Sequence, residues 1–429
     1  MTRHSASRST TPDRPERAAL VGLFNGTSRH FDPEHSLDEL AGLASAAGAS
    51  VVLRVLQERP KPDPATFLGS GKIASLATSC DELDVDAVIF DNELTPAQLR
   101  NLEERLGRKV IDRTQLILDI FARRARTREG KLQVELAQLK YLMPRLVGSS
   151  AALSRLGGGI GTRGPGETKL ETDSRRIRHR ISLLSKEIDV VRQRRSQLRE
   201  RRHKAAVPTV ALVGYTNAGK TTLFNSLTGG DAVASDALFV TLDPLVRKVR
   251  LLDRRELLVS DTVGFIDRLP HSLVAAFRAT LEEVAAADLL LHVIDASDPE
   301  RDRHIAAVHT VLAEVGAERV PSVEVFNKCD AVSDAERDRV RALHPGALCV
   351  SAITGEGRDD LIAAMESRLA LDTAKVVMEF EAGDADRARI AHLYRIGRIL
   401  RHVAVNGRVS IEAEVPRRVL EHFPSAVLQ

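Results

Sequence analysis

The sequence predicts an α/β protein in which a doubly wound sheet domain with a phosphate-binding loop follows a small α/β domain and an antiparallel helical hairpin, and precedes a small α+β domain. Three observations lead to this prediction. Short apolar runs alternate with helical patterns along two stretches of the chain, which is typical of parallel sheets covered by helices. One run, at residues 209–213, leads into a glycine-rich loop and a helix. Between the two stretches, apolar residues repeat at heptad spacing, as they do in paired helices.

The composition is that of a globular protein with several domains, because 429 residues are too many for one compact core. Cys80, Cys329 and Cys349 are isolated from one another, which argues against a disulfide framework and a zinc site. Aromatic residues make up 3% of the chain, so base stacking on aromatic rings is not expected to be the main binding mode. No apolar run approaches the ~20 residues that span a bilayer. Together these features favour a cytoplasmic protein.

The N-terminal part is predicted to begin with a disordered tail, residues 1–17, which is rich in Ser, Thr and Arg and lacks the apolar core of a signal peptide. Residues 18–111 are predicted to form a small parallel α/β domain. Its apolar runs and the helical patterns between them occupy residues 19–23, 36–47, 51–56, 72–83, 87–90, 95–106 and 110–111.

Residues 112–204 are predicted to form a basic helical hairpin whose helices are joined by the glycine-rich residues 157–166. Arg195 takes one position of the apolar seam. From residue 113 to residue 204 the chain carries 23 Lys and Arg against 9 Asp and Glu, a net charge of +14, although the whole chain carries only +3. Such a segment is the electrostatic footprint expected for a polyanion such as nucleic acid. A solvated helix face is the simpler alternative.

The second α/β stretch, residues 205–371, has the alternation of a doubly wound sheet. Residues 372–429 are predicted to form an α+β domain with strands at 376–380 and 409–414 and an amphipathic helix at 386–402. The histidines are scattered, and His292, inside an apolar run, is interpreted as a core residue rather than a metal ligand.

The strongest motif is GYTNAGKT, which matches the phosphate-loop pattern GxxxxGK[ST] between a strand and a helix. Its backbone N–H groups are expected to surround the phosphates. Lys220 is expected to reach the β- and γ-phosphates, and the Thr221 hydroxyl to ligate Mg²⁺. The predicted contacts are Gly214, Tyr215, Thr216, Asn217, Ala218, Gly219, Lys220, Thr221 and Thr222.

Two further segments are placed to act on the γ-phosphate. The sequence DTVG comprises Asp261, Thr262, Val263 and Gly264; its carboxylate is expected to hold Mg²⁺ through water, and Gly264 permits a close backbone approach to the phosphate. The sequence FVTLD comprises Phe239, Val240, Thr241, Leu242 and Asp243. It lies where a switch loop supplies a second hydroxyl to Mg²⁺. We therefore predict metal ligation by Thr221 and Thr241, and catalytic roles for Lys220, Thr241 and Gly264.

The sequence NKCD, which comprises Asn327, Lys328, Cys329 and Asp330, indicates the base. The Asp330 carboxylate can accept two hydrogen bonds from the N1–H and N2–H₂ edge of guanine, whereas adenine offers no such donor pair. The aliphatic stem of Lys328 can cover the base. Backbone N–H groups of Ser351, Ala352 and Ile353 are predicted to face the guanine O6. These motifs together favour GTP over ATP.

Phe265 follows Gly264 where many GTP hydrolases place a glutamine that orients water. A phenyl ring cannot hydrogen-bond water, so we expect slow unassisted hydrolysis, with the attacking water positioned by a partner surface or by backbone groups near Thr241 and Gly264. The sequence GSGK at residues 69–72 is only part of a phosphate-loop pattern and is interpreted as the start of a helix. A second nucleotide site there is the alternative.

The chain resembles the HflX GTPases, a family of the translation-factor-related P-loop group. The resemblance rests on the sequences GGIGTRGPGETKLETD at residues 158–173, GFIDRLPH at 264–271, FDNELTPAQL at 90–99, GSGK at 69–72 and FVTLD at 239–243. It implies a P-loop GTPase domain, slow intrinsic hydrolysis, and a hairpin loop at residues 157–169 that reaches into the rRNA of the large (50S) ribosomal subunit. It also implies a role in splitting or rescuing stalled or idle ribosomes.

Two other functions stay open on the sequence. One is a GTP-regulated adaptor whose basic hairpin binds another acidic surface. The other is an RNA-remodelling enzyme that uses ATP at the N-terminal domain. Nothing in the sequence demands more than a monomer.

Overall fold

A computed structural model describes residues 14–25, 32–154, 169–204, 207–234, 238–251, 256–267, 281–369, 373–381, 384–405, 408–416 and 427–428. The chain forms two compact units, one of Met1–Arg123 with Ala137–Ile181 and one of Arg124–Leu136 with Ser182–Gln429. Most of the predicted hairpin loop at residues 157–169, and most of the predicted tail at 1–17, lie outside the described residues. Within the described part of the chain, no helix is long and apolar enough to cross a membrane.

The first unit is built on a parallel four-stranded sheet of order β2-β1-β3-β4. Local signals set its helices: Thr95 and Gln98 form a capping box at the start of α3, and Gly107 ends that helix with φ +60. The first strand already includes Glu16 and Arg17, which the sequence had placed in the tail. The elements are β1 (Glu16–Phe24), α1 (Pro33–Ala46), β2 (Ala49–Glu58), α2 (Ser70–Glu82), β3 (Ala87–Phe90), α3 (Pro96–Leu106), β4 (Lys109–Asp112) and α4 (Arg113–Arg124).

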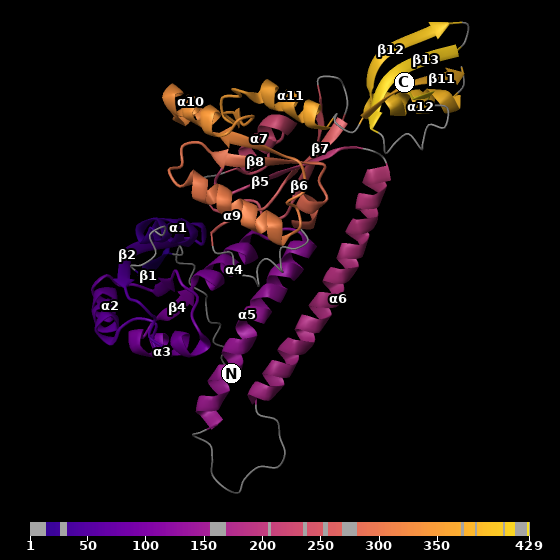
Figure 1. The fold of residues 1–429 in the computed structure, drawn as a ribbon. Helices are drawn as coiled ribbons and strands as arrows, with labels where there is room; N and C mark the ends of the chain where they lie inside the picture. Colours follow the sequence, from indigo (N-terminus) through magenta and orange to yellow (C-terminus); the bar gives the residue numbers. More distant parts are fainter. Residues whose placement is uncertain are drawn as a thin grey trace, which may run out of the picture. The chain divides into compact units, whose positions relative to one another are not determined.

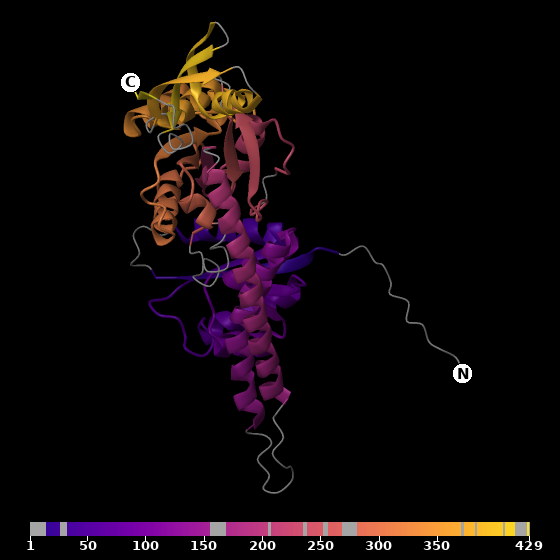
Figure 2. The same cartoon turned by 90° about the vertical axis from the view of Figure 1, so that its right-hand side faces the viewer.

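Two long helices follow, α5 (Arg128–Ser154) and α6 (Lys169–Lys204), which run side by side in opposite directions in Figures 1 and 2. Within the second unit, Glu129 of α5 forms an ion pair with Arg195 of α6 at 2.8 Å, and Arg128 pairs with Glu187 at 3.2 Å. Glu129 is buried. The charged residue in the apolar seam is therefore explained by a partner carboxylate on the facing helix.

The second unit contains a six-stranded sheet of order β10-β9-β8-β5-β7-β6, in which only β6 runs antiparallel to its neighbour (Figure 1). Side chains of α7 and α11 pack on one face and those of α9 and α10 on the other, which confirms the doubly wound prediction. The elements are β5 (Thr209–Gly214), α7 (Lys220–Thr228), β6 (Leu245–Arg250), β7 (Glu256–Asp261), β8 (Leu289–Asp295), α9 (Arg301–Glu314), β9 (Ser322–Asn327), η1 (Cys329–Ala331), α10 (Asp334–Leu343), β10 (Leu348–Cys349) and α11 (Arg358–Leu369).

The C-terminal residues form an antiparallel sheet of order β12-β13-β11-β14 with α12 along one face (Figure 2). The predicted helix at 386–402 was too long, because the helix ends at Ile396 and a strand follows. Gly397 lies between the helix and that strand, and a Cβ there would lie 2.8 Å from Val415 Cγ1, so this position favours glycine. The elements are β11 (Thr373–Glu381), α12 (Asp384–Ile396), β12 (Arg398–Val405), β13 (Arg408–Pro416) and β14 (Val427–Leu428).

Candidate nucleotide-binding site

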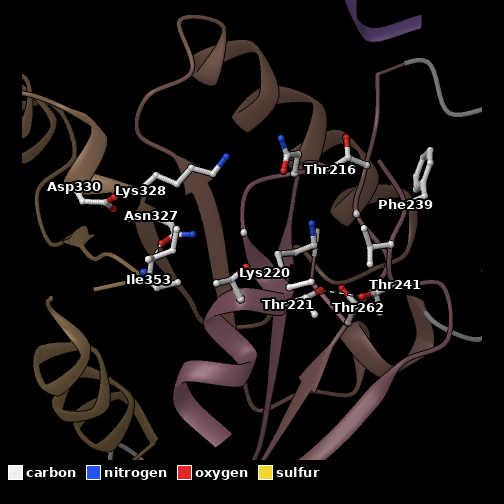
Figure 3. A pocket seen from close by; sticks show the side chains of 17 residues that line it. Thr216, Lys220, Thr221, Phe239, Thr241, Thr262, Asn327, Lys328, Asp330 and Ile353 are labelled. Carbon is white, nitrogen blue, oxygen red and sulfur yellow. Dashed lines mark hydrogen bonds between the residues drawn. The ribbon is translucent and has the colours of Figure 1, made fainter. Parts of the chain in front are cut away.

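The phosphate loop, DTVG and NKCD begin at the carboxyl ends of β5, β7 and β9, where open α/β sheets bind ligands. A cavity of about 390 Å³ opens there. Figure 3 shows Lys220, Thr221 and Thr241 together at one side of it and Lys328 and Asp330 at the other. The lining residues are Thr216, Asn217, Gly219, Lys220, Thr221, Thr222, Ala234, Phe239, Val240, Thr241, Thr262, Gly264, Asn327, Lys328, Asp330, Ala352 and Ile353.

Two glycines of the phosphate loop are required by the geometry. Gly214 has φ +153, and a Cβ there would lie 2.2 Å from the carbonyl oxygen of Val293. Gly219 has φ +85, and a Cβ there would lie 2.2 Å from Asn327 Nδ2. The loop can therefore close against β8 and β9 only without side chains at these positions. It delivers the N-terminus of α7 to the cavity, where unpaired backbone N–H groups favour anions.

The Lys220 ammonium is folded back onto this loop. Its Nζ donates to the carbonyl oxygens of Gly214 at 3.1 Å and Tyr215 at 2.6 Å, and the residue is only 6% exposed. Burial lowers the pKa of Lys220 to about 8, and the Asp261 carboxylate opposes that shift. A poorly solvated cation at the edge of an anion-binding loop is suited to bind phosphate.

Two hydroxyls and a carboxylate converge beside Lys220. The Oγ1 atoms of Thr221 and Thr241 lie 2.8 Å apart, and Asp261 Oδ2 accepts hydrogen bonds from them at 2.7 Å and 3.2 Å. The other carboxylate oxygen, Oδ1, is buried with no hydrogen-bond partner in the described part of the chain. Burial raises the pKa of Asp261, while the Thr221 hydrogen bond and Lys220 oppose the change. Hard oxygen donors around an unsatisfied carboxylate oxygen fit Mg²⁺.

Gly264 lines the cavity on the β7 side, and Phe265, next to it, holds the phosphate loop. A Cβ at Gly264 would lie 2.9 Å from Thr216 Cα and 3.0 Å from Lys220 Nζ, so a side chain would displace the phosphate loop. The Phe265 N–H donates to the Gly214 carbonyl at 3.0 Å, and its carbonyl accepts from the Thr216 N–H at 2.7 Å. The phenyl ring is 1% exposed. Phe265 thus fixes the loop and does not present its ring to the cavity.

The opposite side of the cavity is held by Asn327. Its Nδ2 donates to the Ala218 carbonyl at 2.9 Å, and its Oδ1 accepts from the Ala352 N–H at 3.0 Å, so one side chain joins the phosphate loop to the loop after β10. Lys328 adopts φ +62 and forms an ion pair with Asp295 at 2.6 Å. The Asp330 carboxylate lines the cavity beside it (Figure 3). The two carboxylate oxygens of Asp330 suit the neighbouring N1–H and N2–H₂ donors of guanine.

Several predicted contact residues support the cavity from behind instead of lining it. The Tyr215 ring stacks on His304 with centroids 3.7 Å apart, and its hydroxyl accepts from the Asp267 N–H at 2.7 Å. The Ser351 N–H donates to the Glu356 carbonyl at 3.0 Å. The residues outside the lining are Gly214, Tyr215, Ala218, Leu242, Asp243, Asp261, Val263, Cys329 and Ser351. Ala234 lines the cavity although it belongs to no motif, and no sequence signal pointed to it.

The segment at residues 69–72 begins a helix, as interpreted from the sequence. Gly69 is the N-cap of α2, and its N–H donates to Gln57 Oε1 at 3.1 Å. The Cβ position at Gly71 meets nothing within 4 Å. A second nucleotide site at this point gains no support from these contacts.

Comparison with protein families covers most of the chain. Residues 34–122 match the family model described as the GTP-binding GTPase N-terminal region, and residues 124–202 match that of the GTP-binding GTPase middle region. Residues 209–328 match the family described as the 50S ribosome-binding GTPase. The last match contains the phosphate loop, Thr241 and Asp261.

Full-length relatives are similar along nearly the whole sequence. The GTPase HflX of Caldanaerobacter subterraneus subsp. tengcongensis is 45% identical over 96% of this chain and 94% of its own. The GTPase HflX of Escherichia coli is 44% identical over 97% of this chain and 98% of its own. A GTP-binding protein from the archaeon Sulfolobus solfataricus, solved in complex with GDP, is 25% identical over 82% of this chain and 98% of its own, with a TM-score of 0.45.

Proposed function

Since the chain belongs to the HflX family of GTP-hydrolysing enzymes, we propose that it binds the large (50S) ribosomal subunit through rRNA and uses GTP hydrolysis to split or rescue stalled or idle ribosomes. The observation that carries the proposal is the net charge of +14 on residues 113–204, a segment that contains α4 and the helical pair α5 and α6 and that precedes the GTPase domain. A phosphate backbone is the polyanion that such a surface fits best. Arg175, Arg176, Arg178 and Arg180 are exposed on α6.

In the proposed nucleotide complex, Lys220 and the N-terminus of α7 bind the β- and γ-phosphates. Thr221 and Thr241 would hold Mg²⁺, with Asp261 acting through water, and the ion would supply positive charge beside the phosphates. Asp330 selects guanine by accepting from its N1–H and N2–H₂ groups. Because the Phe265 ring is buried, we propose that the attacking water is oriented by backbone groups near Gly264 and Thr241 or by a ribosomal surface.

The proposed organisation follows the sequence division into residues 18–111, 112–204, 205–371 and 372–429. We propose that the protein works in the cytoplasm as a monomer, with the hairpin loop at 157–169 as its contact with rRNA.

Co-sedimentation with purified ribosomes tests the proposal. The protein should pellet with 50S subunits more strongly with a non-hydrolysable GTP analogue than with GDP, and isolated 30S subunits should retain less of it. Raising the salt concentration should weaken the association steeply, because phosphate contacts release counterions.

The matched variants separate the nucleotide site from the RNA surface. Lys220→Ala should abolish the difference between analogue and GDP, whereas Arg176→Glu combined with Arg178→Glu should weaken 50S binding with unchanged GDP affinity. Light scattering of 70S ribosomes then distinguishes splitting from binding alone. If neither binding nor GTP turnover depends on ribosomes, the proposal is wrong and an adaptor for another acidic partner becomes the better explanation.

A further inference from the structure

The predicted switch segment at residues 239–243 makes a contact that leads away from the nucleotide cavity. The Asp243 carboxylate lies at the N-terminus of α5, where Oδ2 accepts hydrogen bonds from the N–H groups of Arg126 and Thr127, each at 2.9 Å. Its Oδ1 accepts from the Thr127 hydroxyl. Thr127 Oγ1 in turn accepts from the Gly130 N–H at 3.0 Å. Asp243 and α5 residues 128–136 belong to the same compact unit.

Thr127 is the N-cap residue of α5, because its hydroxyl accepts from the Gly130 N–H and its carbonyl from the Lys131 N–H, and Asp243 completes this cap from a distant part of the chain by binding Thr127. A carboxylate at a helix N-terminus satisfies unpaired N–H groups and interacts favourably with the helix dipole. Asp243 lies 117 residues from Arg126 along the sequence. Gly130 makes room for it, because a Cβ there would lie 2.4 Å from Asp243 Oδ1 and 3.3 Å from Asp243 Cγ. Glycine is unfavourable inside helices, so the presence of Gly130 in the first turn of α5 is explained by the contact with the Asp243 carboxylate.

The same short segment reaches the nucleotide cavity at its other end. Thr241, two residues before Asp243, bonds to Asp261 and lies 2.8 Å from the Thr221 hydroxyl. Leu242, between them, is buried at 4% exposure. The segment is therefore held at three successive residues. Only two peptide bonds separate Asp243 from Thr241, so the two contacts are closely linked along the backbone.

We propose that Asp243 is a positioning residue for GTP hydrolysis: by capping α5 it holds the Thr241 hydroxyl over the γ-phosphate side of the cavity. The contact works in both directions, since a ligand that fixes Thr241 also stabilises the cap. Glu129, next to Gly130, pairs with Arg195 of α6 at 2.8 Å, so the cap lies at the base of the helical pair. The inference rests on GTP binding and hydrolysis and does not require the ribosome.

Nucleotide affinities measured without ribosomes test the proposal. Asp243→Ala should weaken binding of a fluorescent non-hydrolysable GTP analogue roughly 2- to 30-fold, the range for losing an N-cap side chain, with GDP affinity unchanged. The maximal rate of GTP hydrolysis should fall with it. Asp243→Asn keeps one acceptor oxygen and should restore part of the analogue affinity. Hydrogen exchange of the Arg126 and Thr127 amides should be slower with the analogue than with GDP.

Gly130→Ala provides a second variant that does not threaten the helix. Alanine is the better helix former by about 1 kcal/mol, which should offset much of the stability that is lost when the added Cβ displaces Asp243, whereas analogue affinity should fall. Gly71→Ala is the matched control, since it lies in the first turn of α2 with nothing within 4 Å of its Cβ position; it should leave nucleotide binding unchanged.

A double-mutant cycle completes the test, because Gly130→Ala should have no further effect on analogue affinity once Asp243 is alanine. The proposal is overturned if Asp243→Ala and Gly130→Ala leave the analogue affinity unchanged, if they weaken GDP equally, or if their effects are additive.

Discussion

The buried Lys220 ammonium makes nucleotide binding dependent on pH in a direction that its surroundings fix. Burial lowers its pKa from the ordinary value of 10.5 to about 8, which corresponds to about 3 kcal/mol of lost preference for the charged form. A bound phosphate favours the ammonium. The nucleotide phosphates are already ionised above pH 8, since their last pKa is near 6. Binding of GDP or GTP above about pH 8 should therefore take up a proton at Lys220.

The magnitude follows from the same pKa. About half a proton should be taken up per nucleotide at pH 8 and nearly one at pH 9, and the observed affinity should fall by up to about tenfold per pH unit above 8. Below pH 7 the uptake should vanish, because Lys220 is then protonated in both states. The stability of the free protein has the opposite pH dependence. Between about pH 8 and 10.5 Lys220 is neutral in the folded state and still charged in the unfolded state, so its contribution to the free energy of unfolding rises with pH in that range.

Isothermal titration calorimetry with GDP in buffers of different ionisation enthalpy measures the proton uptake directly. Lys220→Arg is the control, because a guanidinium stays charged throughout this range, and its binding should show no uptake. Equal uptake by the parent and the arginine variant, or none in the parent between pH 8 and 9, would refute the reasoning about Lys220.

Three further changes test other parts of the molecule. Asp330→Asn should lower the affinity for guanine nucleotides about 10- to 100-fold, because the guanine N1–H and N2–H₂ donors lose a charged acceptor. Competition binding with GDP and XDP measures the affinities, and an unchanged affinity for GDP would contradict the role of Asp330. Phe265→Ala should lower the free energy of unfolding by about 3–5 kcal/mol in urea titrations, since a fully buried ring is removed. Phe265→Gln should not speed GTP hydrolysis in single-turnover kinetics, and a faster Gln variant would show that this side chain reaches the cavity. Burial lowers the pKa of His292 to about 3, so stability should be lost as pH falls below the ordinary value of 6.5, by about 1.4 kcal/mol per pH unit; His292→Leu should flatten the acid side of the stability curve in urea titrations, and an unchanged slope would mean that other groups govern it.

The nucleotide-binding motifs could be predicted from the sequence because the residues of each motif are neighbours along the chain. The strand, glycine loop and helix at residues 209–228 lie together in sequence, and their spacing is set by backbone geometry around Gly214 and Gly219. The structure brings Lys220, Thr221, Thr241 and Asp330 to one cavity. The first two and Asp330 follow strands β5 and β9, and Thr241 lies in the segment between the phosphate loop and DTVG.

Elements that depend on distant partners were predicted less well. Strand β6, Leu245–Arg250, is mostly exposed at the sheet edge, so it has charged side chains and no apolar run to mark it. Residues 398–405 continue the helical pattern of α12 in sequence, but they pair with β13 along the register from Arg398 to Val405. That pairing, which overrides local propensity, is a property of the folded C-terminal sheet.

The sequence by itself determined that this protein is a P-loop GTPase, because a phosphate loop and a guanine motif each need only neighbouring residues to be recognised, and its resemblance to the HflX GTPases likewise rests on contiguous segments such as residues 158–173 and 264–271. Only the tertiary structure decided what Asp243 does. Its carboxylate meets the N-terminus of α5 far away along the chain, and Gly130 is small because that carboxylate is there. A contact of this kind arises when two segments pack together, and neither segment contains the information alone.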